Sequence, residues 1–430
     1  MVPGMPRSDT PLPDGRAERP RMPLAVYVLG LSVFALGTSE FMISGLLQPL
    51  ARDMDVSIPQ AGLLVSAFAI GMVVGAPVLA GATLRLPQRT TLIALLAVFG
   101  LGQVAGAVAP SYGVLFASRV VSALACAGFW AVGAAVAVSL APPGMKARAM
   151  SVMIGGLSIA NVVGVPAGAV LGQHAGWRAA FWAVAAMSAL ALAGVLALVP
   201  RTQPPTGAER PRLRRELRIY RDGQVWLAIA ITALNAAATF CLFSYLSPLL
   251  TDTAGLDESW VPTVLVLYGV GALIGTAVGG RVADAHLFGT MYTGLAATTA
   301  VLALLALTAH LPAAAVGLAL CLGLTSFFTA PAINARMFDI AGAAPTLAGA
   351  TNTSAFNIGN TLGPWVGGLV IGAGWGYKAV SWTSAALAVA AVGATAVASR
   401  WHRRTAASRV VAGSRPAPAV PAADTGTAAG

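Results

Sequence analysis

The chain has 430 residues, of which 57% are hydrophobic and only 10% are charged, and its mean hydropathy is +0.78. Its formal net charge of +11 comes from 26 Lys and Arg against 15 Asp and Glu. This composition excludes a soluble enzyme and predicts an all-α integral membrane protein.

An N-terminal tail, residues 1–22, is rich in Pro and Arg, and we expect it to be disordered. Twelve apolar stretches follow it, each near the roughly 20 residues that a helix needs to cross a hydrocarbon core about 30 Å thick. They lie at about 24–47, 60–82, 90–109, 113–140, 150–172, 179–199, 225–250, 261–280, 288–309, 312–335, 347–372 and 379–399.

A segment rich in Pro and Arg, residues 201–222, separates the sixth stretch from the seventh and is predicted to be a cytoplasmic linker. It divides the chain into an N-terminal six-helix bundle, residues 23–200, and a C-terminal six-helix bundle, residues 223–400. The last residues, 401–430, are rich in Ala and Pro, and we expect a second disordered tail. The three cysteines lie in separate spans, so the sequence predicts neither a disulfide nor a metal site.

The two halves repeat each other at an offset near 200 residues, which is typical of a duplicated six-helix unit. Gly71 and Gly75 in the second span correspond to Gly271 and Gly275 in the eighth. The segment GWRAAFW, which starts at position 176, likewise corresponds to GYKAVSW, which starts at position 376. The predicted fold is therefore twelve transmembrane helices arranged as two six-helix repeats.

The distribution of Lys and Arg predicts the orientation, because cytoplasmic loops carry the excess of basic residues. Placing both ends of the chain inside puts 22 of the 26 basic residues on the cytoplasmic side. We therefore expect a multi-pass membrane protein with both termini in the cytoplasm. The basic residues are dispersed over separate loops, which argues against a nucleic-acid partner.

Only two ionisable residues lie deep inside the predicted spans, Glu40 in the first and Arg119 in the fourth. Such residues usually face a cavity or pair with each other, and they mark an ion or substrate path. At about 1.5 Å per residue, both lie about 10 Å below the outer surface, where they can meet or share a water molecule. We predict that Glu40 carries a proton and that Arg119 tunes it, since burial and a nearby positive charge act on a carboxylate in opposite senses. The alternative is a static ion pair that fixes two helices.

The fifth span carries small or helix-bending residues at short intervals, namely Gly164, Pro166, Gly168 and Gly172. Small residues spaced by four let helix backbones approach closely. This pattern is similar to the antiporter motif of the major facilitator superfamily. Arg119 resembles that family's buried arginine of the fourth span, although the Gln-Gly that usually follows it is missing here. The loop GATLRLPQR, from position 81, resembles the family's gating motif without its usual Asp.

Over about residues 22–400 the chain resembles the twelve-helix drug:proton antiporters of this superfamily. The segments GTSEFMISGLL from position 37 and FSYLSP from position 243 are similar to those of actinobacterial chloramphenicol exporters. This resemblance implies a bacterial cell-membrane protein that exports small amphipathic drugs, chloramphenicol among them. Export would proceed by alternating access, with the proton gradient as the energy source and no cofactor. Arabinose-type sugar exporters and purine or nucleoside exporters share much of the first segment and are the alternatives.

Aromatic and amide side chains inside the spans are candidates to line a cavity for a flat amphipathic drug. An amide in hydrocarbon needs a hydrogen-bond partner, which a polar group of the drug can supply. The predicted substrate-binding residues are Phe41, Phe68, Phe129, Trp130, Asn235, Phe240, Tyr245, Tyr268, Asn352, Phe356 and Asn357. Further candidates are Phe327, Asn334 and Asn360.

Two other classes of protein fit the sequence less well. A membrane enzyme would need a reactive motif, yet the chain has no HExxH or CxxC, and neither Lys146 nor Lys378 lies in a phosphate-binding loop. A non-transporting membrane sensor would carry a sizeable soluble domain, whereas the tails here are short. The expected partners are a small-molecule drug, protons and the lipid bilayer, with the chain as a monomer.

Overall fold

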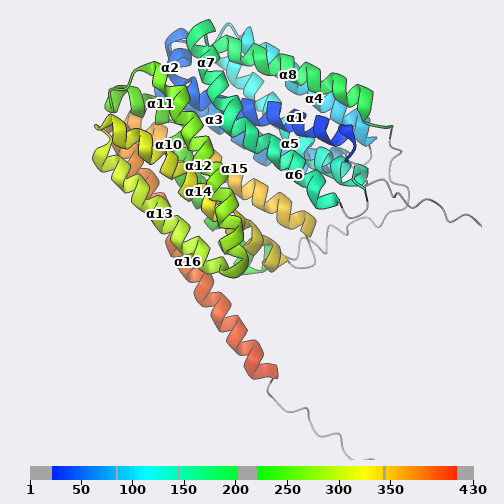
Figure 1. The fold of residues 1–430 in the computed structure, drawn as a ribbon, viewed down its shortest axis with the longest axis vertical. Helices are drawn as coiled ribbons and strands as arrows, with labels where there is room; N and C mark the ends of the chain where they lie inside the picture. Colours follow the sequence, from blue (N-terminus) through cyan, green and yellow to red (C-terminus); the bar gives the residue numbers. More distant parts are fainter. Residues whose placement is uncertain (1–21, 84–85, 143–144, 202–219, 342–344, 414–430) are drawn as a thin grey trace, which may run out of the picture.

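The computed structural model describes residues 22–83, 86–142, 145–201, 220–341 and 345–413, and all regular structure in these residues is helical. The expected N-terminal tail and most of the linker 201–222 lie outside the described residues. In Figure 1 the helices from α1 to α8, blue to green, form one group, and those from α10 to α16, yellow-green to red, form the other. The predicted all-α fold is confirmed.

The N-terminal half consists of α1 Leu24–Phe41, η1 Met42–Gly45, α2 Leu47–Asp53, α3 Ile58–Thr83, α4 Gln88–Ala107, α5 Tyr112–Leu140, α6 Lys146–Ile159, η2 Ala160–Gly164, α7 Val165–Ala175 and α8 Trp177–Leu198. The C-terminal half consists of α10 Gly223–Phe243, α11 Leu246–Pro248, η4 Leu249–Thr253, η5 Glu258–Trp260, α12 Val261–Ala285, α13 Leu287–Thr308, α14 Pro312–Ala341, α15 Pro345–Gly372 and α16 Gly376–Gly413. Among these elements η2 and η4 are single π-helical turns, and η1 and η5 are 3₁₀ turns.

Eleven of the described helical segments are long and apolar enough to cross a membrane, and they match eleven of the twelve predicted spans. The remaining span, predicted at 347–372, is occupied by α15, a helix of 28 residues that is too polar to be counted with the others. Its first half is rich in Thr and Asn. Because α15 packs against α10 and α3, its polar residues can face protein instead of lipid.

Three predicted spans are interrupted where the sequence pattern shows a continuous helix. The first span tightens into η1 after Phe41, and the seventh ends as α10 at Phe243 before α11 and η4 begin. In the fifth span the π-turn η2 ends two residues before Pro166. A proline inside a helix lacks an N–H and its ring crowds the carbonyl four residues earlier, and a π-turn relieves that conflict.

The last helix extends further than the sequence suggested. The sequence predicts a disordered tail from residue 401, whereas α16 continues to Gly413 and projects away from the bundle (Figure 1). The segment after Trp401 is rich in Ala and Arg, which have high intrinsic helix propensity, so the helix has no local reason to end at the membrane surface.

The packing repeats between the halves, as the sequence repeat predicts. Helix α3 packs on α5 as α12 packs on α14, and α4 packs on α8 as α13 packs on α16. The repeated glycines lie at the contact of α3 with α5 and at the corresponding contact of α12 with α14. A Cβ at Gly71 would lie 2.6 Å from the Cβ of Ala123 in α5, and one at Gly271 would lie 2.2 Å from the carbonyl of Leu320 in α14. Small residues therefore allow the same close helix pair in each half.

The two halves contact each other along α3 and α15 and along α12 with η2 and α7. At Gly269 of α12 a Cβ would lie 2.8 Å from Cα of Val162 in η2, so the backbones nearly touch there. The charge distribution predicts that the end of the bundle with α2, α7 and α11 faces outside (Figure 1), and we call it the outer end. At this end α11 also contacts η1 and α2.

Candidate functional site

Glu40 lies in the last turn of α1, directly before η1, and the residue is only 8% exposed. Arg119 of α5 is fully buried beside it. Its Nη2 donates to the backbone carbonyl of Glu40 at 3.4 Å, and its Nη1 donates to Oγ of Ser39 at 2.8 Å. The two residues are therefore neighbours, but the guanidinium binds the backbone of Glu40 and not its carboxylate. Within the described residues, the ion pairs are Arg52–Glu258 and Arg178–Asp53, at the outer end.

A buried hydrogen-bond network holds Arg119 in this position. Ser39 donates to Oε1 of Gln103 at 3.1 Å, and Nε2 of Gln103 donates to Oγ of Ser122 at 3.1 Å. The guanidinium carbon also lies 4.3 Å from the centre of the Phe68 ring, a cation–π contact. The network joins α1, α3, α4 and α5. Our sequence analysis did not identify Gln103, although a glutamine inside a predicted span is itself a signal of a buried polar contact.

The glycines of the fifth span pack directly on the segment that contains Glu40. A Cβ at Gly164 would lie 2.1 Å from Oγ1 of Thr38, and one at Gly172 would lie 2.1 Å from Cδ2 of Leu46. Between them, a Cβ at Gly168 would meet Cβ of Met42 at 3.3 Å. Three glycines spaced by four thus face three residues spaced by four: Thr38 in α1, Met42 in η1 and Leu46 directly before α2. This interface therefore has no room for larger side chains.

An aromatic cluster begins at the residue after Glu40. The rings of Phe41 and Phe240 stack at 5.3 Å and join the two halves. Phe240 meets Phe243 and Phe356 edge to face, and Phe243 stacks on Tyr268 at 4.4 Å. The members of this aromatic cluster are Phe41, Phe240, Phe243, Tyr268, Phe327 and Phe356. All but Phe243 are candidates from the sequence, and Phe243 lies in the segment that resembles the chloramphenicol exporters.

The other aromatic candidates occupy different surroundings. Phe68 lies against Arg119, while Phe129 is fully buried in α5 and Trp130, next to it, is half-buried. Tyr245 is fully buried and donates to the carbonyl of Pro364 at 2.7 Å. A Cβ at Gly62 of α3 would lie 2.3 Å from its hydroxyl, so Tyr245 fills the joint between the halves.

The amide candidates divide into two groups. Asn352 donates to Asn334 and accepts from Thr232 at 3.3 Å, so its polar atoms have partners within the protein. By contrast, Oδ1 of Asn235, Asn357 and Asn360 is buried without a hydrogen-bond partner, as are the hydroxyls of Tyr268 and Ser326. A buried polar atom without a partner costs about 1–3 kcal/mol, so these atoms are the better candidates to bind a polar group of a ligand.

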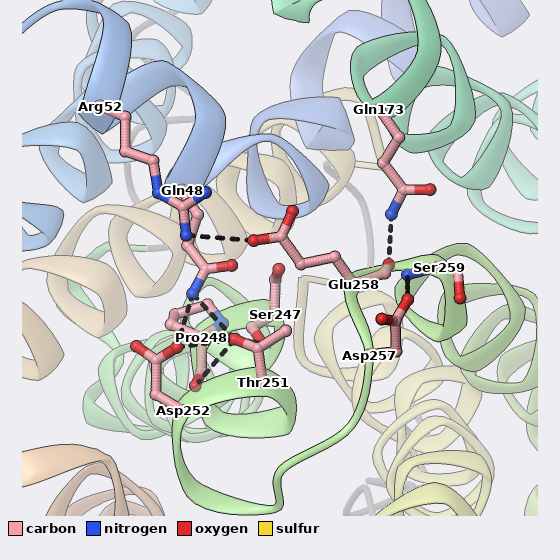
Figure 2. A network of polar contacts seen from close by, with 10 residues as sticks. All are labelled: Gln48, Arg52, Gln173, Ser247, Pro248, Thr251, Asp252, Asp257, Glu258 and Ser259. Atoms are coloured by element: carbon pink, nitrogen blue, oxygen red, sulfur yellow. Dashed lines mark hydrogen bonds and ion pairs between the residues drawn. The ribbon is translucent and has the colours of Figure 1, made fainter.

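Polar residues of both halves meet at the outer end, as Figure 2 shows. Nε2 of Gln48 in α2 donates to Thr251 at 2.8 Å and to Asp252 at 2.9 Å, both in η4. Arg52 pairs with Glu258 of η5 at 3.1 Å, and Gln173 of α7 donates to the backbone carbonyl of the same Glu258. A pocket of about 410 Å³ lies beside these contacts, lined by Gln48, Arg52 and Asp252 among others. We call these contacts between halves the outer network.

A separate ion pair at the outer end stays within the N-terminal half. Asp53 of α2 accepts from Arg178 and, at 3.0 Å, from Nε1 of Trp177 in α8. The hydrogen bond from Arg178 and then that from Trp177 hold the pKa of Asp53 below its ordinary value. As for metals, the described residues contain no group of three or more His, Cys, Asp or Glu side chains that could hold a metal ion.

Comparison with known proteins agrees with this architecture. Residues 29–356 match the family model of the Major Facilitator Superfamily. A solved structure of a bacterial homologue of the human lysosomal transporter Spinster, in an inward-facing and unoccupied conformation, has the same fold, with a TM-score of 0.70 at 18% identity. That match covers 92% of this chain and 98% of the other.

Two curated relatives are more similar in sequence. The chain is 39% identical to a chloramphenicol resistance protein of Streptomyces lividans over 374 residues, which are 86% of this chain and 95% of the relative. It is 38% identical to the inner membrane transport protein YdhP of Escherichia coli K12, over 82% of this chain and 90% of that protein.

Proposed function

Because the chain belongs to the major facilitator superfamily, and is thus a multi-pass membrane transporter and not an enzyme, we propose that it is a proton-coupled exporter of small amphipathic drugs, with chloramphenicol as the leading substrate. The observation that carries the proposal is the position of Glu40. This buried carboxyl lies beside a buried cation, at the end of α1, and next in sequence to an aromatic ring that contacts the other half.

The coupling follows from what the described groups can do. Glu40 binds a proton, and Arg119 is the charge that favours its release, because a positive charge stabilises the ionised carboxylate. The segment around Glu40 packs on the glycines of η2 and α7, and η2 in turn touches α12 of the other half. A change in the protonation of Glu40 therefore acts on a segment through which the halves move relative to each other.

The aromatic cluster and the unpartnered amides support the substrate class. The rings offer flat apolar faces, while Asn235, Asn357 and the hydroxyl of Tyr268 offer polar atoms that lack partners. Binding sites for drug-sized molecules combine such apolar walls with a few polar groups. A neutral aromatic amide with hydroxyl groups, as chloramphenicol is, matches this combination better than a large permanent cation does, since Glu40 cannot serve both the proton and a cationic drug.

The test is uptake of radiolabelled chloramphenicol into everted membrane vesicles that contain the protein, with and without an uncoupler. We expect accumulation that requires the proton gradient, together with raised chloramphenicol tolerance of a sensitive host. Wild-type protein present in the membrane with neither effect contradicts the drug assignment. That outcome would redirect the search to the sugar and purine exporters, whose substrates can be offered to the same vesicles.

The proposed orientation, with both termini in the cytoplasm of a bacterial cell, rests on the distribution of basic residues. A reporter enzyme that is active only outside the membrane should be silent when fused after Arg214 and active when fused after Asp257. The reverse result refutes the orientation and exchanges the outer and inner ends of the bundle.

A further inference from the structure

We infer that Gln103 is a positioning residue for proton coupling, because it fixes Ser39 so that Arg119 is held away from the carboxylate of Glu40. The inference rests on the proposed function of Glu40 and extends it to a residue on a third helix. It starts from an amide that is completely buried in α4, where only hydrogen bonds can offset the cost of removing it from water.

The hydrogen-bond chain has one consistent direction. Ser39 has a single hydroxyl proton, and its oxygen accepts from Nη1 of Arg119 at 2.8 Å. The proton is therefore free to point at Oε1 of Gln103, 3.1 Å away, while Nε2 of Gln103 donates to Ser122. If the amide were turned over, Ser39 would face two donors and could no longer donate its own proton to Gln103. Gln103 thus orients the lone pair of Ser39 toward the guanidinium.

Arg119 is held by three contacts, none of which is the carboxylate. These are the Ser39 hydroxyl, the backbone carbonyl of Glu40 and the face of Phe68. Its Nε is buried without a hydrogen-bond partner. A guanidinium with a spare donor beside a buried carboxyl has a second arrangement available. This is the direct ion pair, which forms when the carboxyl is ionised. The strength of the Ser39 contact sets the balance between the two arrangements.

Among the charged groups near Glu40, Arg119 is the one that can set the balance between these two arrangements. On α5, the guanidinium of Arg119 and the neutral thiol of Cys126 are the titratable groups near Glu40. The elements α3, α6, η2, α7, α8, α11 and α12 also pack near α1 or η1, and of these α3, η2 and α11 carry no ionisable residue. Helix α12 carries Tyr268 of the aromatic cluster and, near its C-terminal end, Arg281 and Asp284. The ionisable residues of α6, α7 and α8 are at or near the ends of these helices: Lys146, Arg148, His174 and Arg178.

The experiment reads the titration of Glu40 itself, without transport. In detergent-purified protein, the infrared band of a protonated carboxyl that disappears in Glu40→Gln is followed against pH. Gln103→Leu keeps the bulk of the side chain but frees Ser39, so Arg119 should move to the carboxylate and favour its ionised form. We expect the midpoint of the band to shift by about one unit toward lower pH, which corresponds to about 1.4 kcal/mol.

Two further variants separate positioning from packing. Ser39→Ala removes the same anchor, so it should shift the midpoint in the same direction, and it also serves if Gln103→Leu does not fold. The double variant should shift no further than the larger single shift, since both act through one chain of contacts. Gln224→Leu is the matched control, because Gln224 accepts from the buried Arg336 at 2.6 Å in the other half, and it should leave the midpoint unchanged.

Three results would overturn the inference: an unchanged or raised midpoint in both single variants, shifts that add in the double variant, or no titrating band that depends on Glu40. The assay of export in vesicles is independent of this measurement. If the protein moves no drug but shows the shifted midpoints, the drug assignment is wrong and Gln103 still sets the titration of Glu40. If it exports the drug but the midpoints do not shift, the proposed export stands and the role of Gln103 is refuted.

Discussion

The outer network and the region around Glu40 place their charged groups in different surroundings. In the outer network, Arg52 and Glu258 form an ion pair whose side chains are 69% and 49% exposed. Around Glu40, the buried Arg119 binds a hydroxyl, a backbone carbonyl and an aromatic ring. Exposed ion pairs are worth about 0–1 kcal/mol, so the outer contacts can form and break easily. A buried charge with neutral partners responds strongly to any change in protonation beside it.

The largest expected effect on export comes from removing the carboxyl group of Glu40, which binds the proton. Glu40→Gln keeps the volume of the side chain but can neither gain nor lose a proton. We expect uphill export in vesicles to fall by about 100-fold or more, the usual contribution of a positioned proton-transfer group, while drug binding survives. The control is Asp257→Asn, because Asp257 is exposed and only caps η5. Export by Glu40→Gln at the wild-type rate would make Glu40 structural. The proton route would then run through an acidic residue near a helix end, such as Asp284 of α12 or Asp339 of α14.

The next largest effect is expected from the close helix packing around Glu40. Gly164→Ala would place a Cβ 2.1 Å from Oγ1 of Thr38, two residues before Glu40, whereas a Cβ at Gly155 in the same span meets nothing within 4 Å. Overpacking of this kind costs about 1–3 kcal/mol. We expect Gly164→Ala to lower the melting temperature and the export rate, and Gly155→Ala to change neither. Equal behaviour of the two variants would refute a close contact between η2 and α1.

Substitutions at the outer end should have a smaller effect on the conformational balance. Only those that remove a contact between the halves should have it. Arg52→Ala removes a contact between the halves, while Arg178→Ala removes an ion pair within one half. A loss of about 0.2–1 kcal/mol shifts the balance between outward-open and outward-closed states by up to about fivefold. Spin labels on the outer ends of the two halves should report this shift for Arg52→Ala only. If Arg178→Ala shifts the distances as much, the outer network is not specific to the interface.

The smallest expected effect concerns pH and Asp53. Its pKa is lowered in the folded protein by Arg178 and Trp177, so the ionised form stabilises the fold above the ordinary aspartate pKa of about 4. The contribution is lost as pH falls through the lowered value. Because the pair is well exposed, we expect Asp53→Asn to cost under about 1 kcal/mol at pH 7. The melting temperatures of the two proteins should converge once the pH falls below the lowered pKa of Asp53, and a difference that persists there would show a contribution from packing instead of charge.

Much of the candidate site could be read from residue types, because buried polar residues stand out in apolar spans. Glu40 and Arg119 are conspicuous for this reason, and helix rise alone placed them at one depth. Aromatic rings are less informative, since most of them only pack. The contacts separate Phe41 and Phe240, which join the halves in the aromatic cluster, from Tyr245, which is hydrogen-bonded within the joint.

The sequence by itself determined the membrane class, the span positions, the internal repeat and the residues able to hold a charge. These depend on composition, length and periodicity, which are local properties of the chain. Only the tertiary structure decided which groups satisfy one another: Gln103 with Ser39, Arg119 with a backbone carbonyl, and Gln48 with Asp252, 204 positions away. Such pairings depend on how helices rotate and cross, and on where α1 tightens and the fifth span takes a π-turn. A change of one residue in helical phase moves a side chain by about 100° around the axis, which is enough to exchange its partners.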